Sequence, residues 1–134
     1  MEELTRNKQQ ELIMICIYDA LLYSDMGEEF SLEAIMEGVF GLPYEDIPYY
    51  SKAIVVKTLS HINEIKQIYQ PKMPKWSFDR LSVVEQAILL MSYTHFHEEK
   101  VEKKIVIDVA IRLAKKFLDQ DDYKFVNAIL DNVL

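Results

Sequence analysis

A cluster of cations and aromatic residues near the C-terminal end is the group best suited to chemistry in this 134-residue sequence. The cluster comprises Arg112, Lys115, Lys116, Tyr123, Lys124 and Phe125. Lysine and arginine hold phosphates, and an exposed aromatic ring stacks on an unpaired base, so the combination suits single-stranded RNA. Lysines are also favoured at the C-terminal end of any helix by the helix dipole. Two interpretations therefore stay open: an RNA surface, or a solvated helix end with Phe125 in the core.

Other chemistries have less support in the residues. Cys16 is the only cysteine and lies in the apolar run LIMICIY, which is typical of a buried structural thiol. His95 and His97 are two positions apart, so on a helix they point to different sides, and we interpret all three histidines as solvated or half-buried. The three glycines form no phosphate-binding motif. We assign no catalytic residue, metal or cofactor, and an enzyme of unrecognised type remains an alternative.

Composition bounds the class of protein. Half of the residues are hydrophobic, and only three are glycine and four proline, which predicts one domain over residues 1–134 with a sizeable core. No apolar run reaches the roughly 18–20 residues that a membrane span requires. The start, MEELTRNKQQ, is acidic and unlike a signal peptide. With a single cysteine, these features predict a cytoplasmic protein.

The net charge of −7 is unevenly distributed along the chain. Residues 1–51 carry two cations and eleven carboxylates, a balance of −9, whereas residues 52–134 carry thirteen cations and eleven carboxylates, a balance of +2. The acidic total argues against strong nucleic-acid binding that ignores sequence, but it leaves room for a local basic patch in the second half.

Capping residues and proline predict the helices of the first half. The sequence predicts a helix capped by Thr5 that runs to about Ser24, and a second from Ser31 to about Phe40 that ends at Gly41. A long third helix is predicted from about Pro48 to Tyr69, where Pro71 stops it.

The second half is predicted to be helical as well. A short turn over 77–81 precedes Ser82-Val83-Val84-Glu85, which has the pattern of a capping box, and the helix from Ser82 to about Phe96 is apolar on most sides and therefore central. A helical hairpin follows over 105–131, and Asp121 and Asp122 are expected to cap its second helix. Its predicted buried faces comprise Ile107, Ala110, Ile111, Ala114, Phe117 and Leu118, then Phe125, Val126, Ile129, Leu130, Val133 and Leu134. The predicted fold class is all-α, with six to seven helices.

Several of these segments resemble the NusB family of bacterial transcription antitermination factors. The family carries a run close to I-N-E-A-[IV]-E-L-A-K-x-F, an acidic loop, and K-F-V-N-G-[VI]-L-D, which residues 107–117 and 124–131 match. Residues 76–81 and 84–89 look like its W-x-L-[DE]-R-[IL] and V-[ED]-[KR]-A-[IV]-L-R. Tyr18 stands where the family often has the aromatic residue that closes the A-L-Y or A-L-F of its first helix.

This resemblance implies an all-helical fold of two packed bundles and a function without catalysis. It implies binding of the single-stranded boxA element of nascent RNA together with a small-subunit ribosomal protein. It further implies assembly with other transcription elongation factors on RNA polymerase, mainly during ribosomal RNA synthesis.

The resemblance also suggests roles for individual residues. Together with the basic cluster, it assigns RNA binding to Arg6, Lys8, Tyr18, Lys115, Lys124 and Phe125. Asp121 falls in the loop beside the RNA, and Glu85 falls on the helix that faces the ribosomal protein.

The chain departs from the family pattern at several positions, some of which carry cations in the family. The arginine-rich start is reduced to Arg6 and Lys8, and each lost phosphate contact weakens RNA binding. Val109, Leu90 and Ala128 replace the family's Glu, Arg and Gly. The alternative is therefore a NusB-like protein-interaction module with weak or no RNA binding, of which the helical domain that precedes some RNA methyltransferases is a variant. The sequence leaves the oligomeric state open, with a monomer and a homodimer as alternatives.

Overall fold

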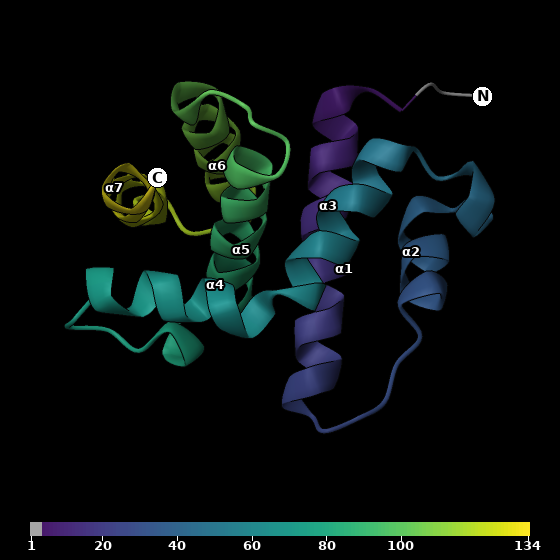
Figure 1. Cartoon of the computed structure of the whole chain (residues 1–134), viewed down its shortest axis with the longest axis horizontal. Helices are drawn as coiled ribbons and strands as arrows, with labels where there is room; N and C mark the ends of the chain where they lie inside the picture. Colours follow the sequence, from purple (N-terminus) through teal and green to yellow (C-terminus); the bar gives the residue numbers. More distant parts are fainter. Residues whose placement is uncertain (1–3) are drawn as a thin grey trace.

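The computed structural model describes residues 4–134, so the acidic start at Glu2 and Glu3 lies outside the described part. Over this range the chain forms seven α-helices and three short 3₁₀ turns, without a strand, which confirms the all-α prediction (Figure 1). The helices are α1 (Arg6–Asp25), α2 (Leu32–Phe40), α3 (Tyr49–Ser60), α4 (Ile62–Tyr69), α5 (Val83–His97), α6 (Lys103–Phe117) and α7 (Asp122–Val133). The turns are η1 (Tyr44–Asp46), η2 (Gln70–Lys72) and η3 (Phe78–Arg80). None of these helices has the length and apolar character needed to cross a bilayer.

The predicted caps are present at the helix ends. The hydroxyls of Thr5 and Ser31 each accept a hydrogen bond from the amide three residues on, at 3.1 and 3.2 Å. Ser82 and Glu85 form the predicted capping box at the start of α5. Gly41 ends α2 in the left-handed conformation, with φ of 68°, which a residue with a side chain rarely adopts. The local sequence therefore determines these boundaries.

The long helix predicted from Pro48 to Tyr69 is wrong, because two helices occupy that range. The helical conformation breaks at His61, which has φ of −117° and ψ of 20°. Helix α3 packs against α1 and α5, whereas α4 packs against α5 and α7. A single straight helix could not bury its apolar positions against both sets of partners, and the break redirects the chain from one to the other.

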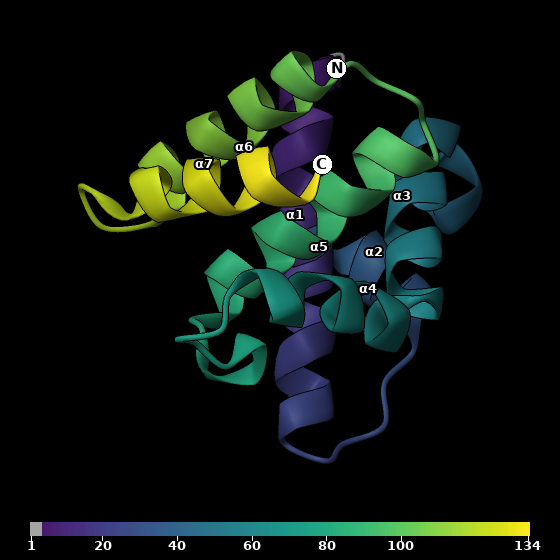
Figure 2. The ribbon, with the colours of Figure 1, turned by 60° about the vertical axis from the view of Figure 1, so that its left-hand side comes forward.

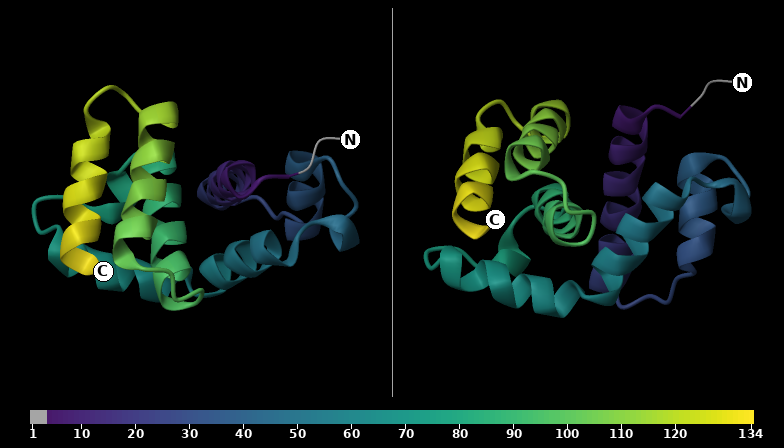
Figure 3. Two further views of the ribbon diagram at one scale, coloured as in Figure 1. Left: turned by 90° about the horizontal axis from the view of Figure 1, so that it is seen from above. Right: turned by 45° about the horizontal axis from the view of Figure 1, so that its top comes forward.

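The helices form two packed bundles, as predicted. Helices α1, α2 and α3 form the first bundle, and α4, α6 and α7 pack around α5 in the second, with α1 lying against α5 between them. Figure 1 shows α2 and α7 at opposite edges of the molecule. Helices α6 and α7 lie side by side as the predicted antiparallel hairpin (Figures 2 and 3).

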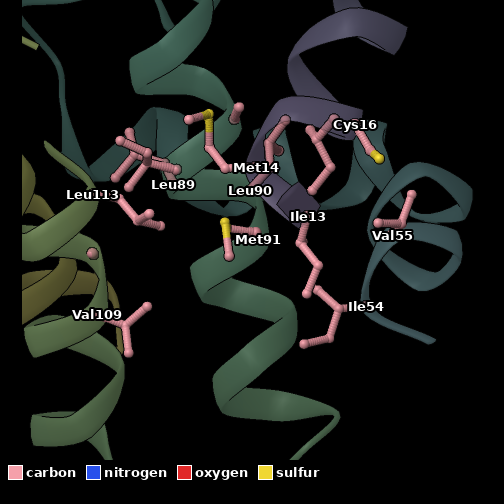
Figure 4. Close-up of a cluster of buried hydrophobic side chains, with 14 of the residues drawn as sticks. Ile13, Met14, Cys16, Ile54, Val55, Leu89, Leu90, Met91, Val109 and Leu113 are labelled. Atoms are coloured by element: carbon pink, nitrogen blue, oxygen red, sulfur yellow. The ribbon is translucent and has the colours of Figure 1, made fainter. Parts of the chain in front are cut away.

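The core joins both bundles through α5. Every residue from Ala87 to Met91 is at most 1% exposed, which confirms that α5 is the central helix. Figure 4 shows Leu89, Leu90 and Met91 between Ile13 and Met14 of α1 and Leu113 of α6. Burial of these side chains removes apolar surface from water, the main stabilising contribution to folding.

The predicted buried face of α6 is wrong in part. The residues buried on this helix are Val106, Val109, Ala110, Leu113 and Ala114. Ile107, Ile111 and Phe117 are half-buried. Because α6 packs against both α5 and α7, the stripe that faces them is centred one position away from the predicted one. The valine at position 109 therefore belongs to the core.

Candidate nucleic-acid interface

Two adjoining hollows lie at the N-terminal ends of α5 and α7. The first, of about 360 Å³, is lined by Tyr18 of α1 and by residues at the start of α5 and the end of α6. The second, of about 340 Å³, lies between the loop that carries Trp76 and the start of α7. Ser82, Glu85 and Asp122 line both hollows, so they form one continuous surface. This turn surface comprises Tyr18, Trp76, Arg80, Ser82, Glu85, Phe117, Asp122 and Phe125.

Helix starts determine the electrostatics of the turn surface. The positive ends of the α5 and α7 dipoles converge here, which favours negative charge. Glu85 uses part of this effect, since its Oε1 accepts a hydrogen bond of 3.3 Å from the Ser82 amide. Asp121 occupies the N-cap position of α7 as expected, but the predicted capping is wrong because its side chain makes no cap hydrogen bond. Its carboxylate instead lies beside Lys124.

Aromatic rings line both hollows. Phe125 is half-buried and meets Trp76 edge to face, with the ring centroids 5.8 Å apart and the planes at 68°. Trp76 is 57% exposed, so the pair presents an aromatic surface to solvent. Tyr18 is half-buried and lines the first hollow. Phe125 therefore lies at the edge of the core and not inside it.

Trp76 also lines the turn surface, although it is not among the residues that the sequence predicts to bind RNA. A single tryptophan between Pro74 and a helix cap was the available indication, because a loop that contains proline rarely buries so large a ring. Its position opposite Phe125 depends on how α7 packs, and the local sequence does not reveal that packing.

Lys115 and Lys124, two cations that the sequence predicts to bind RNA, flank the connection between α6 and α7 and are exposed. The Lys115 ammonium lies 4.6 Å from the ring centre of Tyr123, and the Lys124 ammonium lies 3.5 Å from Asp121 Oδ1. The second pair is more than half exposed, so it holds Lys124 only weakly. Both lysines can therefore turn towards a phosphate.

The remaining cations of the cluster face α1. Lys116 donates a 2.8 Å hydrogen bond to Glu11 Oε1, and Arg112 donates one of 2.9 Å to Asn7. Hydrogen bonding by Lys116 lowers the pKa of Glu11, although burial opposes the shift. Lys8 also lies near this carboxylate, at 3.8 Å. The structure thus divides the cations into an outward group and a group that joins α6 to α1.

Arg6 lies in a polar network at the start of α1. Its guanidinium stacks 3.6 Å from the ring centre of Tyr50, whose hydroxyl lies 3.1 Å from Nε2 of His95. His95 is 3% exposed, so the prediction of a solvated or half-buried histidine is wrong here. Burial, followed by the nearby Arg6 charge, lowers its pKa. Arg6 and Tyr18 are twelve positions apart on α1, about 18 Å along the helix, so the structure does not bring Arg6 into the turn surface.

Fold and surface together define a class: an all-α protein of two packed bundles with an aromatic surface between two helix starts. Among residues 4–134, no group of three or more His, Cys, Asp or Glu side chains is arranged to hold a metal ion. The NusB family model matches residues 7–134, and the chain therefore belongs to the NusB family.

Individual relatives agree with this assignment. The transcription antitermination protein NusB of Pseudothermotoga lettingae is 31% identical over 134 residues, which cover 96% of this chain and 89% of the relative. The NusB of Treponema denticola is 42% identical over 85 residues, which cover 63% of this chain and 62% of the relative. This second alignment therefore spans less than two thirds of either protein.

Solved structures share the fold. A Thermotoga maritima NusB structure covers 99% of this chain and 92% of its own, with a TM-score of 0.76 at 26% identity. A second solved chain, described as "Crystal Structure of a Plectonemic RNA Supercoil", has a TM-score of 0.76 at 24% identity and covers 96% of this chain and 94% of its own. At that identity the second likeness shows the fold alone.

Proposed function

We propose that this chain is a non-enzymatic transcription antitermination factor that binds single-stranded, boxA-type RNA. It does so together with a small-subunit ribosomal protein, and the complex joins other elongation factors on RNA polymerase during ribosomal RNA transcription. Curated relatives carry the name transcription antitermination protein. The observation that carries the RNA proposal is the contact of exposed Trp76 with half-buried Phe125, next to Lys124 in the chain.

The turn surface suits unpaired bases better than a duplex. Its hollows are lined by rings at which bases can stack, each stacked base contributing about 1–3 kcal/mol. Lys115 and Lys124 lie at the neighbouring turn, where they can contact the phosphates between bases. Glu85 and Asp122 disfavour phosphates at the centre, so the backbone would follow the rim while the bases point inward.

Glu85 supports the second half of the proposal. Its carboxylate lies between the two hollows and is half-buried, and its hydrogen-bond partners in the described residues belong to Ser82. A lysine or arginine of a ribosomal protein could approach it, so RNA and protein would meet at adjacent positions. Arg6 and Lys8, at the other end of α1, would contact an RNA long enough to extend past Tyr18.

A second candidate function is a protein-interaction module with weak RNA binding. The observation that favours it is the use of Lys8, Arg112 and Lys116 in contacts with α1 side chains. These cations offer less to phosphate than their number in the sequence indicates.

Titration of fluorescein-labelled boxA-type RNA tests the two candidates. Anisotropy is measured at low salt with this protein alone, with the small-subunit ribosomal protein alone and with both proteins, and a scrambled RNA of equal length is the control. The proposal predicts that RNA binding is tightest with both proteins. A parallel titration labels the ribosomal protein in place of the RNA: binding of this protein to the chain with no gain from RNA would establish the second candidate, and binding of neither would refute both.

A further inference from the structure

A separate groove lies between the C-terminal half of α1 and α2, far from α7 (Figure 1). Its volume is about 410 Å³. We call it the α1–α2 groove. It is lined by Asp19, Tyr23, Glu29, Phe30, Ser31, Ala34, Ile35, Gly38 and Val39. None of these residues takes part in the turn surface.

The floor and walls of the groove are largely apolar. The rings of Tyr23 and Phe30 stack with centroids 6.0 Å apart and are 37% and 41% exposed. Met26 is 60% exposed at the end of α1. Gly38 leaves the groove open, because a Cβ atom placed there would have no neighbour within 4 Å. Bulky apolar side chains of a partner could therefore enter between the helices.

The segments around the groove carry eight carboxylates, whereas the Lys52 ammonium of α3 donates a hydrogen bond to the Tyr44 carbonyl of η1. Residues 9–51 contain no lysine, arginine or histidine. Helix α1 beyond Glu11, α2, η1 and the loop between α1 and α2 carry Asp19, Asp25, Glu28, Glu29, Glu33, Glu37, Glu45 and Asp46. Every ion pair found in residues 4–134 lies elsewhere, so these eight carboxylates have no cationic partner there. Elsewhere, in contrast, lysines pair with nearby acids.

We propose that the α1–α2 groove docks a basic, amphipathic helical segment of a partner protein, whose apolar side chains enter between Tyr23 and Gly38. Charge complementarity supports this occupant, because lysines beside the apolar stripe would meet the unpaired carboxylates. The same carboxylates repel nucleic acid and anionic lipid. A second copy of the chain carries net charge −7 and is repelled as well.

The test uses a synthetic amphipathic peptide of about four helical turns, with leucines on one face and lysines on either side. A second peptide has glutamate in place of each lysine. Binding to the full chain is followed by anisotropy and by amide chemical shifts. We expect the lysine peptide to bind and to shift the Tyr23, Phe30 and Gly38 amides. We expect no binding of the glutamate peptide.

Two matched pairs of variants isolate the groove. Gly38→Trp fills it and should weaken the lysine peptide at least about tenfold, whereas Gly38→Ala keeps it open and should stay within about twofold. Glu29→Lys lies in the lining and should weaken binding, whereas Glu102→Lys makes the same charge change at the start of α6 and should not. Thermal unfolding of each variant confirms that it is folded.

Several results would overturn the proposal. The proposal fails if the lysine peptide does not bind at low salt, if it binds equally to both variants of a matched pair, or if the amide chemical shifts that it changes are confined to helices outside the groove. Self-association of the chain that Gly38→Trp abolishes would assign the groove to a second copy instead. RNA titration is independent of these outcomes, so failure here leaves the proposed function intact.

Discussion

The α1–α2 groove and the turn surface differ in how the charged side chains around them are used. Around the apolar lining of the groove, carboxylates have no cationic partner. At the turn surface and the α6–α7 turn beside it, charged groups have partners within the chain: Lys124 lies 3.5 Å from Asp121, and Glu85 accepts a hydrogen bond from the Ser82 amide. One surface therefore attracts cations at a distance, whereas the other is nearly neutral and offers ring faces at short range.

The comparison explains the uneven charge along the sequence. Residues 1–51 have a charge balance of −9, and their carboxylates without cationic partners lie on and around α1 and α2. Residues 52–134 have a balance of +2, but some of their lysines pair with carboxylates of α1 and α7. Net charge per segment thus agrees with the proposed groove for a cationic partner better than with the proposed RNA surface, where we expect stacking to matter more than charge.

The largest expected effect tests whether the two surfaces belong to one cooperative unit. Leu90 is fully buried in α5, and Leu90→Ala should lower the free energy of unfolding by about 2–5 kcal/mol because it leaves a cavity. Urea unfolding is followed by Trp76 fluorescence and by the Gly38 amide. We expect coincident transitions, and separate ones would contradict the single domain predicted for residues 1–134. Val56→Ala, at a site that is 37% exposed, is the control.

The next effect separates the surfaces by ligand. Phe125→Leu keeps an apolar side chain against Trp76 but removes the ring face, so boxA-type RNA affinity should fall by about 1–3 kcal/mol. Binding of the lysine peptide to the α1–α2 groove should not change. Anisotropy titrations of the one variant with both probes check this, and equal loss of both ligands would mean that the substitution disturbs the fold.

A smaller effect concerns phosphate contacts. Lys124→Ala should reduce the magnitude of the slope of log K for RNA binding against log salt concentration by about 0.7. This is the change expected when one phosphate contact on a single strand is lost. Lys57→Ala removes an ammonium that lies 3.8 Å from Glu98 at the opposite end of α5, and it should leave the slope unchanged. RNA titrations at several salt concentrations provide the measurement, and identical slopes would exclude Lys124 from the interface.

The smallest expected effect is the pH dependence of stability. Burial lowers the pKa of His95 from its ordinary 6.5, so the unfolded chain binds more protons and stability falls as pH drops through that value. Burial raises the pKa of Asp19 in the groove, so its protonation stabilises the fold as pH falls further. His95→Gln should flatten the first dependence and Asp19→Asn the second, measured by Tm between pH 8 and about 4. Unchanged profiles would contradict both assignments.

Local interactions made much of the fold predictable. The hydroxyls of Thr5, Ser31 and Ser82 cap helices by accepting hydrogen bonds from amides three residues further along the chain. Gly41 ends α2 because it adopts the left-handed conformation. The break at His61 was not predictable, because it reflects which bundle each half of the segment joins.

The residues predicted to bind RNA divide in the same way. Outward positions for Lys115 and Lys124 follow from the turn that they flank. The inward position of Arg112 depends on α1, whose Asn7 is 105 positions away in sequence. The pairing of Trp76 with Phe125 also joins distant segments, so single-sequence patterns identified one ring and not the other.

The burial of Cys16 provides a way to time the motions of the first bundle. It is the only cysteine in the chain, and its side chain is inaccessible in the folded protein. Burial also raises the pKa of the thiol to about 12, so the reactive thiolate is scarce until the core opens. The rate at which iodoacetamide alkylates this sulfur therefore reports how often α1 separates from its neighbours. The native sequence thus contains a built-in chemical probe for the opening of the first bundle.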